Sequence, residues 1–231
     1  MRPGLLATVA LAIAGCEPLL ADLDLRRCKP AEGTTGSPST IAEAVDLANG
    51  LPFPVTAECF VEALDRPLSL AATASTSSAQ PAAGRRSTRV LIWPTEDFIV
   101  TGALDGDGRN LVEFGQFVDD DRSIKGELEF PITEPVTTAR ALRRVRNPEF
   151  PNITTCFVCH DDERDEPSVP GGRSSLALRP FERTLVELDE LPKLRDECDP
   201  ATEPDRCRYL RALVDHGPLQ ARAFDPTWSR L

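Results

Sequence analysis

Apolar and polar residues alternate most regularly between residues 88 and 133 of the chain. Within 124–130, apolar or small residues occupy every second position and charged residues lie between them, which is the period of a half-buried strand. Turns rich in glycine and aspartate, at 105–108 and 119–121, separate the runs. Strands joined by such short turns predict an antiparallel, sandwich-like β body or a meander. The predicted strands are 89–93, 98–100, 111–118 and 124–130.

A helical pattern precedes this β region. Ile41, Ala44, Val45 and Ala48 fall on one helix face. Thr40 is a good capping residue, and a glutamate follows it by three positions, as in a capping box. We therefore expect an N-terminal helix that opens a β-rich body over 41–139.

The pattern becomes irregular from residue 140 onward, where prolines, charges and short apolar pieces dominate. One helix is predicted at about 205–216, ended by Gly217 and Pro218. The predicted fold class is mainly β, with the N-terminal helix and a loop-rich, part-helical C-terminal segment over 140–231.

The first 15 residues have the features of a secretory signal. A short apolar run at 5–14 follows Arg2, and it is too short to span a bilayer as a mature helix. Residues 11–16 resemble a bacterial lipobox. The resemblance implies cleavage before Cys16 and acylation of Cys16, with 16–40 as anchor and tether. The alternative is a plain signal peptide in which Cys16 has no such role.

The lipobox resemblance also implies a location at the cell envelope, attached to the membrane by the lipid anchor, on the periplasmic face or the cell surface. Glu17 is not the aspartate that often signals inner-membrane retention, which favours the outer membrane. The 26 basic and 37 acidic residues give a net charge of −11, which argues against nucleic acid as a partner.

Seven cysteines are present, an odd number for a secreted protein. Acylation of Cys16 would leave six, of which two belong to the motif considered next. The other four allow three pairings, and proximity in the chain favours disulfides Cys28–Cys59 and Cys198–Cys207. Such bonds persist outside the cytoplasm.

The segment Cys156-Phe157-Val158-Cys159-His160 has the spacing of a c-type haem attachment site. In such sites two thiols add to the vinyl groups at one porphyrin edge, and the adjacent histidine is the proximal iron ligand. At these five residues the chain resembles c-type cytochromes. The resemblance implies haem c as cofactor, with thioethers at Cys156 and Cys159 and with His160 as the proximal ligand.

The chain also departs from the small-cytochrome pattern. Pro148 and Pro151 argue against the helix that usually precedes the motif. Met1 is the only methionine, so a mature chain would have none to serve as distal ligand. His216 is the one other histidine and is the candidate distal ligand; a bis-histidine iron would have a lower potential than a His/Met one. Two alternatives remain: His216 only interacts with a helix dipole, or the sixth position is open.

Other interpretations of the motif are a disulfide between Cys156 and Cys159, or a zinc site that adds His160 and one further ligand.

The leading functional prediction is a mono-haem c-type envelope lipoprotein that carries electrons and is not an enzyme. A haem peroxidase is a weaker alternative, because only one attachment motif exists. An alternative from a different functional class is that the β body is a non-haem binding module with structural cysteines.

The acidic run 161–166 follows the motif directly. It predicts a solvated loop or, if a haem lies beside it, a docking face for a basic redox partner.

The order of these parts resembles a loose group of bacterial lipoproteins that join a β-rich body to a short segment with one haem-attachment motif. That resemblance implies architecture rather than activity, and it implies order in residues 71–84. The matching residues are Leu51-Pro52, Cys59-Phe60, 78–82, 127–131, the motif at 156–160 and 215–217.

Overall fold

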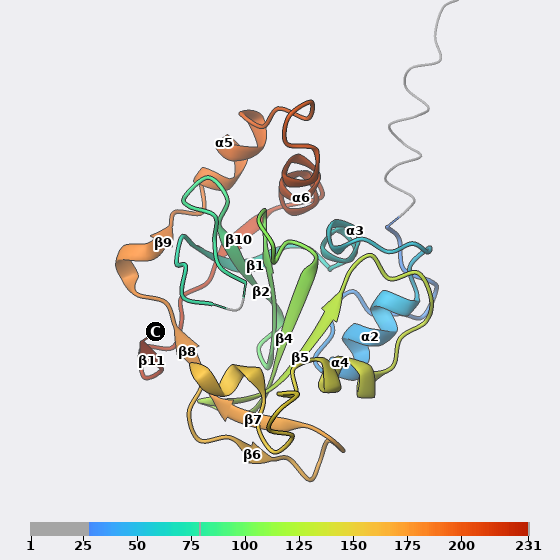
Figure 1. Cartoon of the computed structure of the whole chain (residues 1–231). Coiled ribbons are helices and arrows are strands. Elements are labelled where there is room, and N and C mark those ends of the chain that lie inside the picture. The colour runs from blue at the N-terminus through green and yellow to red at the C-terminus, as the bar shows by residue number, and fades with distance from the viewer. Residues whose placement is uncertain (1–27, 79, 231) are drawn as a thin grey trace, which may run out of the picture.

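The computed structural model describes residues 28–78 and 80–230, and in this part of the chain a nine-stranded mixed sheet dominates (Figure 1). The strand order is β10-β1-β2-β3-β4-β5-β7-β6, and β9 pairs with β1 beside this path. Two short parallel strands, β8 and β11, form a separate ribbon. The strands of the sheet are β1 (Leu68–Thr73), β2 (Arg89–Thr95), β3 (Phe98–Ala103), β4 (Leu111–Asp119), β5 (Arg122–Glu129), β6 (Arg164–Asp165), β7 (Arg173–Leu176), β9 (Leu185–Val186) and β10 (Leu219–Ala221), and the ribbon is β8 (Leu178–Arg179) with β11 (Ser229–Arg230).

Five α-helices and two 3-10 turns complete the described part of the chain, and α2, α3 and α4 lie together on one side of the sheet in Figure 1. The helices are α2 (Ile41–Asn49), α3 (Ala57–Glu62), α4 (Thr138–Arg144), α5 (Glu190–Asp196) and α6 (Pro204–Val214), and the turns are η1 (Thr155–Val158) and η2 (Glu182–Thr184). At the start of α2, the Glu43 N–H donates to the Thr40 hydroxyl at 3.1 Å. The Glu43 carboxylate accepts from the Ser39 N–H at 2.6 Å, so the cap is closed one residue earlier than in a standard capping box.

The chain is β-rich as predicted, and β2 to β5 form the predicted antiparallel meander. The sandwich, however, is wrong, because helices rather than a second sheet cover the apolar face of this meander. Phe114 in β4 packs its ring 5.9 Å from that of Phe60 in α3. A Cβ on Gly126 of β5 would lie 3.1 Å from Ile41 of α2, and one on Gly102 of β3 would collide with Tyr209 of α6. Burial of this face by helices leaves no apolar surface for a second sheet.

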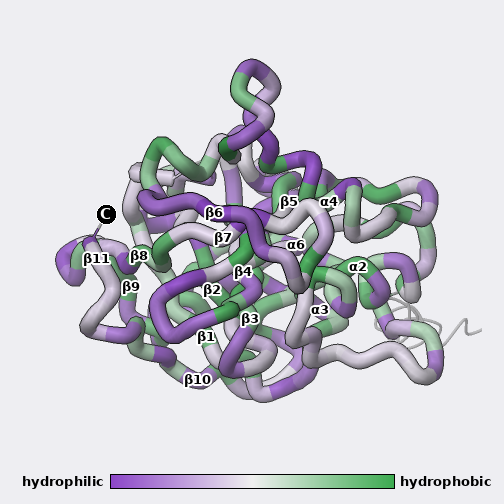
Figure 2. Tube along the Cα trace, turned by 90° about the horizontal axis from the view of Figure 1, so that it is seen from below, coloured by the Kyte–Doolittle hydropathy of each residue, from purple (hydrophilic) through white to green (hydrophobic). Residues whose placement is uncertain are grey.

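The C-terminal segment is built into the same sheet. It supplies β6, β7, β9 and β10, and β10 runs parallel to β1. The ranges 41–139 and 140–231 therefore share one sheet. The short outer strand β6 is strongly hydrophilic along its length (Figure 2), which suits an edge strand.

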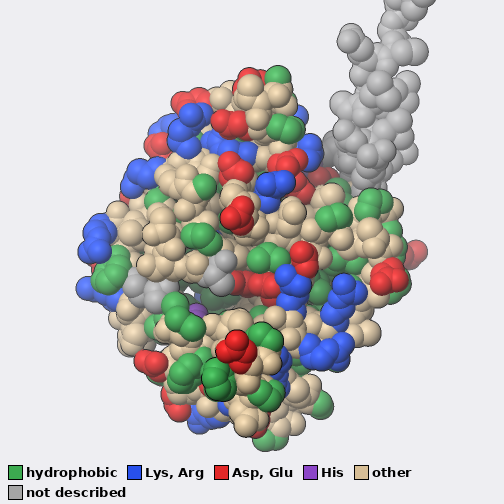
Figure 3. Space-filling view, viewed as in Figure 1, with side chains coloured by type: hydrophobic (Ala, Val, Ile, Leu, Met, Phe, Trp, Pro, Cys, Tyr) green, Lys and Arg blue, Asp and Glu red, His purple; other side chains and the backbone are tan. Residues whose placement is uncertain are grey.

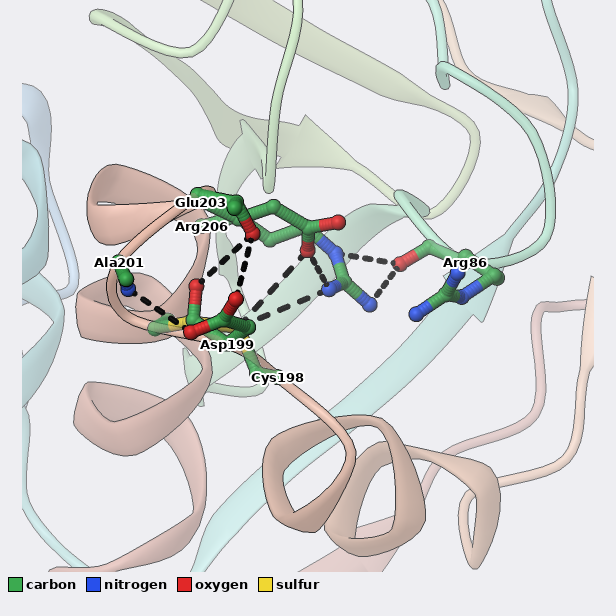
Figure 4. The surroundings of a disulfide bond; sticks show 8 residues. Arg86, Cys198, Asp199, Ala201, Glu203 and Arg206 are labelled. Atoms are coloured by element: carbon green, nitrogen blue, oxygen red, sulfur yellow. Dashed lines mark hydrogen bonds and ion pairs between the residues drawn. A yellow bond between two sulfur atoms is a disulfide. The ribbon is translucent and has the colours of Figure 1, made fainter.

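Both expected disulfides are present, Cys28–Cys59 and Cys198–Cys207. The second joins the end of α5 to α6, next to Arg206, whose Nε and Nη2 donate to the Arg86 carbonyl at 2.9 and 2.7 Å (Figure 4). Arg206 is only 3% exposed, and its two hydrogen bonds connect α6 to the loop before β2.

The expected tether packs on the body over residues 30–40. The Ala31 N–H donates to the Gly50 carbonyl and the Asp65 N–H to the Gly36 carbonyl, each at 2.9 Å. The signal over 1–15 and the acylation of Cys16 lie outside the described residues. None of the helices within 28–78 and 80–230 has the length and apolar character needed to cross a bilayer.

Candidate functional site

A cavity of about 420 Å³ lies between the sheet face opposite the helices and the segment that follows α4. Its volume is in the range of small-molecule and cofactor sites. Figure 3 shows the hollow on the viewed face, with histidine atoms at its edge. One side, here called the sheet side, is made by outward-facing residues of β2 to β5. The opposite cover side is made by the Cys156–His160 turn, residues 177–180 and Trp228.

The sheet side is hollow at its centre because β4 has a glycine there. Gly115 pairs with Ile99 of β3 and with Lys125 of β5. A Cβ on Gly115 would meet only Ser123 and Ile99 atoms, at ordinary distances of 3.5 to 3.9 Å. The residue is not in the left-handed region. Glycine at this position therefore leaves room for the cavity and serves no special backbone conformation.

One tight turn presents the motif to the cavity. Thr154 caps the 3-10 turn η1, its hydroxyl accepting from the Cys156 N–H at 3.1 Å. The N–H groups of Cys159 and His160 both donate to the Cys156 carbonyl, at 3.0 and 2.8 Å. As a result, Cys156, Cys159 and His160 all line the same cavity. No helix directly precedes the turn, since α4 ends at Arg144, before the two prolines.

The imidazole of His160 is oriented by one backbone contact. Its Nδ1 lies 2.7 Å from the Leu176 carbonyl oxygen. A carbonyl only accepts, so Nδ1 carries the proton and Nε2 keeps its lone pair. Burial, with the charge of Lys125 as a second cause, lowers the pKa of His160 to about 3. The ring is therefore neutral at ordinary pH, which is the form that binds metals.

The two motif cysteines are unpaired in the structure, in contrast to the disulfide interpretation. Burial raises the pKa of Cys156 to about 11, whereas the reactive thiol of a redox CxxC site has a lowered pKa. Among the described residues, no three His, Cys, Asp or Glu side chains converge as metal ligands. The zinc interpretation therefore has no convergent set of ligands here.

The acidic run after the motif holds the turn in place and is not simply a solvated loop. The Glu163 side chain is 2% exposed, accepts from the Thr154 N–H at 2.8 Å, and lies 3.4 Å from Arg173 Nε. Asp162 pairs with Arg122, whose side chain is 3% exposed. Sequence reasoning missed these roles, because both arginine partners come from other strands and no local pattern marks them.

Charged groups also line the sheet side of the cavity. Arg89 of β2 pairs with Glu113 of β4 at 2.6 Å. The Lys125 ammonium donates to the Ser123 hydroxyl at 2.6 Å. Burial lowers the pKa of Lys125 to about 8. The alternation in 124–130 predicts a half-buried strand with Lys125 on its polar face. In the structure the cover side of the cavity encloses that polar face.

His216 lies elsewhere. It follows α6, and its Nε2 is 3.6 Å from a carboxylate oxygen of Glu62 in α3. Tyr209 of α6 packs against Gly102, on the helix-covered face of the sheet. His216 is not among the residues that line the cavity. The structure therefore does not bring His216 and His160 together. It gives no support to the prediction that both histidines bind one iron.

The site has to be judged from its own residues. Comparison with protein-family models, with curated proteins and with solved structures finds no match for this chain.

Proposed function

We propose that this chain is a mono-haem c-type protein of the cell envelope that transfers electrons through one haem attached in the cavity. One observation carries the proposal: His160 faces the same cavity as two unpaired cysteines, with Nδ1 held by the Leu176 carbonyl and Nε2 left free. Proteins commonly orient metal-binding histidines by such a contact to the second ring nitrogen.

The residues present fit a covalently attached haem in three respects. Both thiols are free to react. The two thiols and the imidazole line one cavity, and a c-type haem would use the thiols at the ring edge and the imidazole at the iron. Apolar side chains that line the cavity give a flat ring contacts on both sides; they are Leu91, Ile99, Phe117, Val158, Ala177 and Trp228.

Each residue then has a defined task. The haem supplies one-electron redox chemistry when bound. His160 would hold the iron, and the Leu176 carbonyl fixes its tautomer and raises its basicity as a ligand. Cys156 and Cys159 would fix one edge of the ring. Glu163 keeps the attachment turn in place through Thr154. The apolar part of the lining would limit contact between the ring and water, which is one of the factors that set a haem potential.

Electron transfer is favoured over catalysis because the middle of the motif, residues 157–159, lies at the surface. Val158 is 85% exposed, Phe157 45%, and Cys159 is exposed. A ring attached there would have an edge close to the surface, where a partner protein can approach. The net charge of −11 suits a partner with a basic docking face. Attachment to the membrane through acylated Cys16 belongs to the same proposal and rests on the lipobox resemblance alone.

The direct test is a pyridine haemochrome spectrum of the full chain, made with c-type maturation machinery. We expect an α band of the thioether type in the wild type and its loss in the double variant Cys156→Ala/Cys159→Ala. The matched control Cys198→Ala/Cys207→Ala removes two cysteines that do not line the cavity, and the α band should remain. A colourless wild-type protein, under conditions in which a control cytochrome matures, would favour the non-haem binding module instead.

A further inference from the structure

We propose that Lys125 is the second axial ligand of the iron, bound from the sheet side opposite His160; this inference rests on the proposed function. Ligation would use the lone pair of the neutral amine, after the ammonium has released one proton to solvent. The iron keeps its oxidation state in this step.

The two side chains approach the cavity from different sides. His160 belongs to the turn on the cover side, whereas Lys125 rises from β5 on the sheet side. Both residues line the same cavity. A ring held by His160 from the cover side would meet Lys125 on the sheet side.

No other described residue on the sheet side supplies a comparable ligand. Arg89 lines the cavity as well, but a guanidinium does not lose its proton in proteins. Glu113 is already paired with Arg89 at 2.6 Å. The remaining polar groups of β3 to β5 on this side are the hydroxyls of Thr101 and Ser123, which are poor iron ligands when neutral.

The use of lysine in this chain points in the same direction. Lys29, Lys125 and Lys193 are the only lysines among 26 basic residues, so arginine carries nearly all the positive charge. Lys29 and Lys193 are exposed, and Lys125 is the lysine that lines the cavity. Arginine could provide a charge at this position but could not bind iron, because it stays protonated.

The surroundings give the amine both a fixed position and room to move. Its Nζ is 2.6 Å from the Ser123 hydroxyl, and Ser123 is 2% exposed and belongs to the same strand. Gly115, directly across from Lys125 on β4, leaves the neighbouring space free of a side chain. A side-chain rotation would therefore carry the amine from Ser123 towards the ring without moving the sheet.

The test uses the full matured chain with ¹⁵N-labelled lysine. Pulsed electron paramagnetic resonance on the ferric wild type should show a ¹⁵N coupling to the iron, which only a bound lysine produces. Lys125→Ala and Lys125→Arg should each lose the low-spin, six-coordinate spectrum and become high-spin, while His216→Ala, the matched control, keeps the wild-type spectrum.

Three results would overturn the inference: no ¹⁵N-lysine coupling, a five-coordinate ferric wild type, or a Lys125→Ala spectrum equal to that of the wild type. In each case a persistent thioether α band would leave the proposed function intact. A wild type without that band would remove both. The labelled wild type decides alone if the lysine variants do not fold.

Discussion

The two faces of the meander β2 to β5 differ sharply although they are built from the same strands. On the helix-covered face, Phe114, Val100 and Ile92 are no more than 2% exposed and belong to the core cluster that also contains side chains of the helices. On the cavity face, the neighbouring positions hold the Arg89–Glu113 pair, Lys125 and Gly115. Because successive side chains of a strand point to opposite faces, the same sheet has a packed apolar core on one side and a charged cavity wall on the other.

This difference indicates that the two faces of the sheet have different roles, one in stability and one in the candidate site. The helix-covered face contributes most of the stability, because apolar burial is the main favourable term in folding. The cavity face keeps polar groups and empty space, both of which cost stability and are typical of functional sites. Substitutions on the two faces should thus have separable effects, the first on folding and the second on ligand attachment.

The largest effect on folding is expected for Phe114→Ala. Phe114 packs between the rings of Phe60 and Phe98, with centroids 5.9 and 5.7 Å away. Removal of a buried phenyl ring from a core typically lowers the free energy of unfolding by about 3–5 kcal/mol. Thr101→Ala on the cavity face removes hydrogen bonds to Arg89 and Glu113 and should cost only about 1–2 kcal/mol. Urea denaturation of the unliganded chain measures both, and equal losses would contradict the division between the faces.

The buried carboxylate under the motif should have the next largest effect. Glu163→Gln leaves Arg173, whose side chain is 10% exposed, without its buried charge partner. The expected loss is about 2–3 kcal/mol, less than for a fully buried pair, because Arg173 also contacts Asp165. Asp165→Asn is the matched control: Asp165 pairs with the same arginine at 2.6 Å but is 78% exposed, so its loss should be below about 1 kcal/mol. A loss for Asp165→Asn as large as that for Glu163→Gln would show that the buried position of Glu163 is not what matters.

A pH dependence should follow from the neutral His160. The pKa of His160 is about 3 in the folded chain, against an ordinary value of 6.5, so between these limits the unfolded chain binds a proton that the folded chain does not. The free energy of unfolding should therefore fall as the pH drops from 6.5 towards 3, with a slope of up to about 1.4 kcal/mol per pH unit from this group. Urea midpoints of the unliganded wild type and His160→Asn, measured at several pH values in this window, should converge at low pH. Parallel curves would mean that His160 titrates normally.

The sequence predicted the features that depend on neighbouring residues. The meander, the helix at 205–216 and both disulfides follow from local periodicity, turn residues and proximity. The single sheet could not be predicted, because it depends on β10 and β7 reaching β1 and β5 from far along the chain.

The same limit applies to the candidate site. The spacing of Cys156, Cys159 and His160 marked the motif, and these residues do share a cavity. The alternation in 124–130 places Lys125 on the polar face of a half-buried strand, but alternation does not tell what covers each face. Glu163 was placed in a solvated run, because its partner Arg173 lies on a separate strand.

Two glycines in adjacent strands allow the finest comparison of the faces. Gly115 of β4 opens on the cavity, and a Cβ there meets nothing closer than 3.5 Å. Gly126 of β5 faces the core, where a Cβ would lie 3.1 Å from Ile41. Valine at Gly126 should overpack the core and lower the free energy of unfolding by about 1–3 kcal/mol. Valine at Gly115 should change it by less than about 1 kcal/mol, because valine is favoured in strands.

The effect of Gly115→Val should instead appear in the cavity. Its side chain would project into the space that the ring needs, so the haem content after maturation should fall from Gly115 through Gly115→Ala to Gly115→Val. The haemochrome absorbance per protein measures this series, and urea midpoints check that folding is preserved. Full haem content in a stably folded Gly115→Val protein would show that the ring does not occupy the cavity between the sheet and His160. Haem attachment, if it occurs, would then have to take place on the outer side of the motif, next to the exposed Phe157.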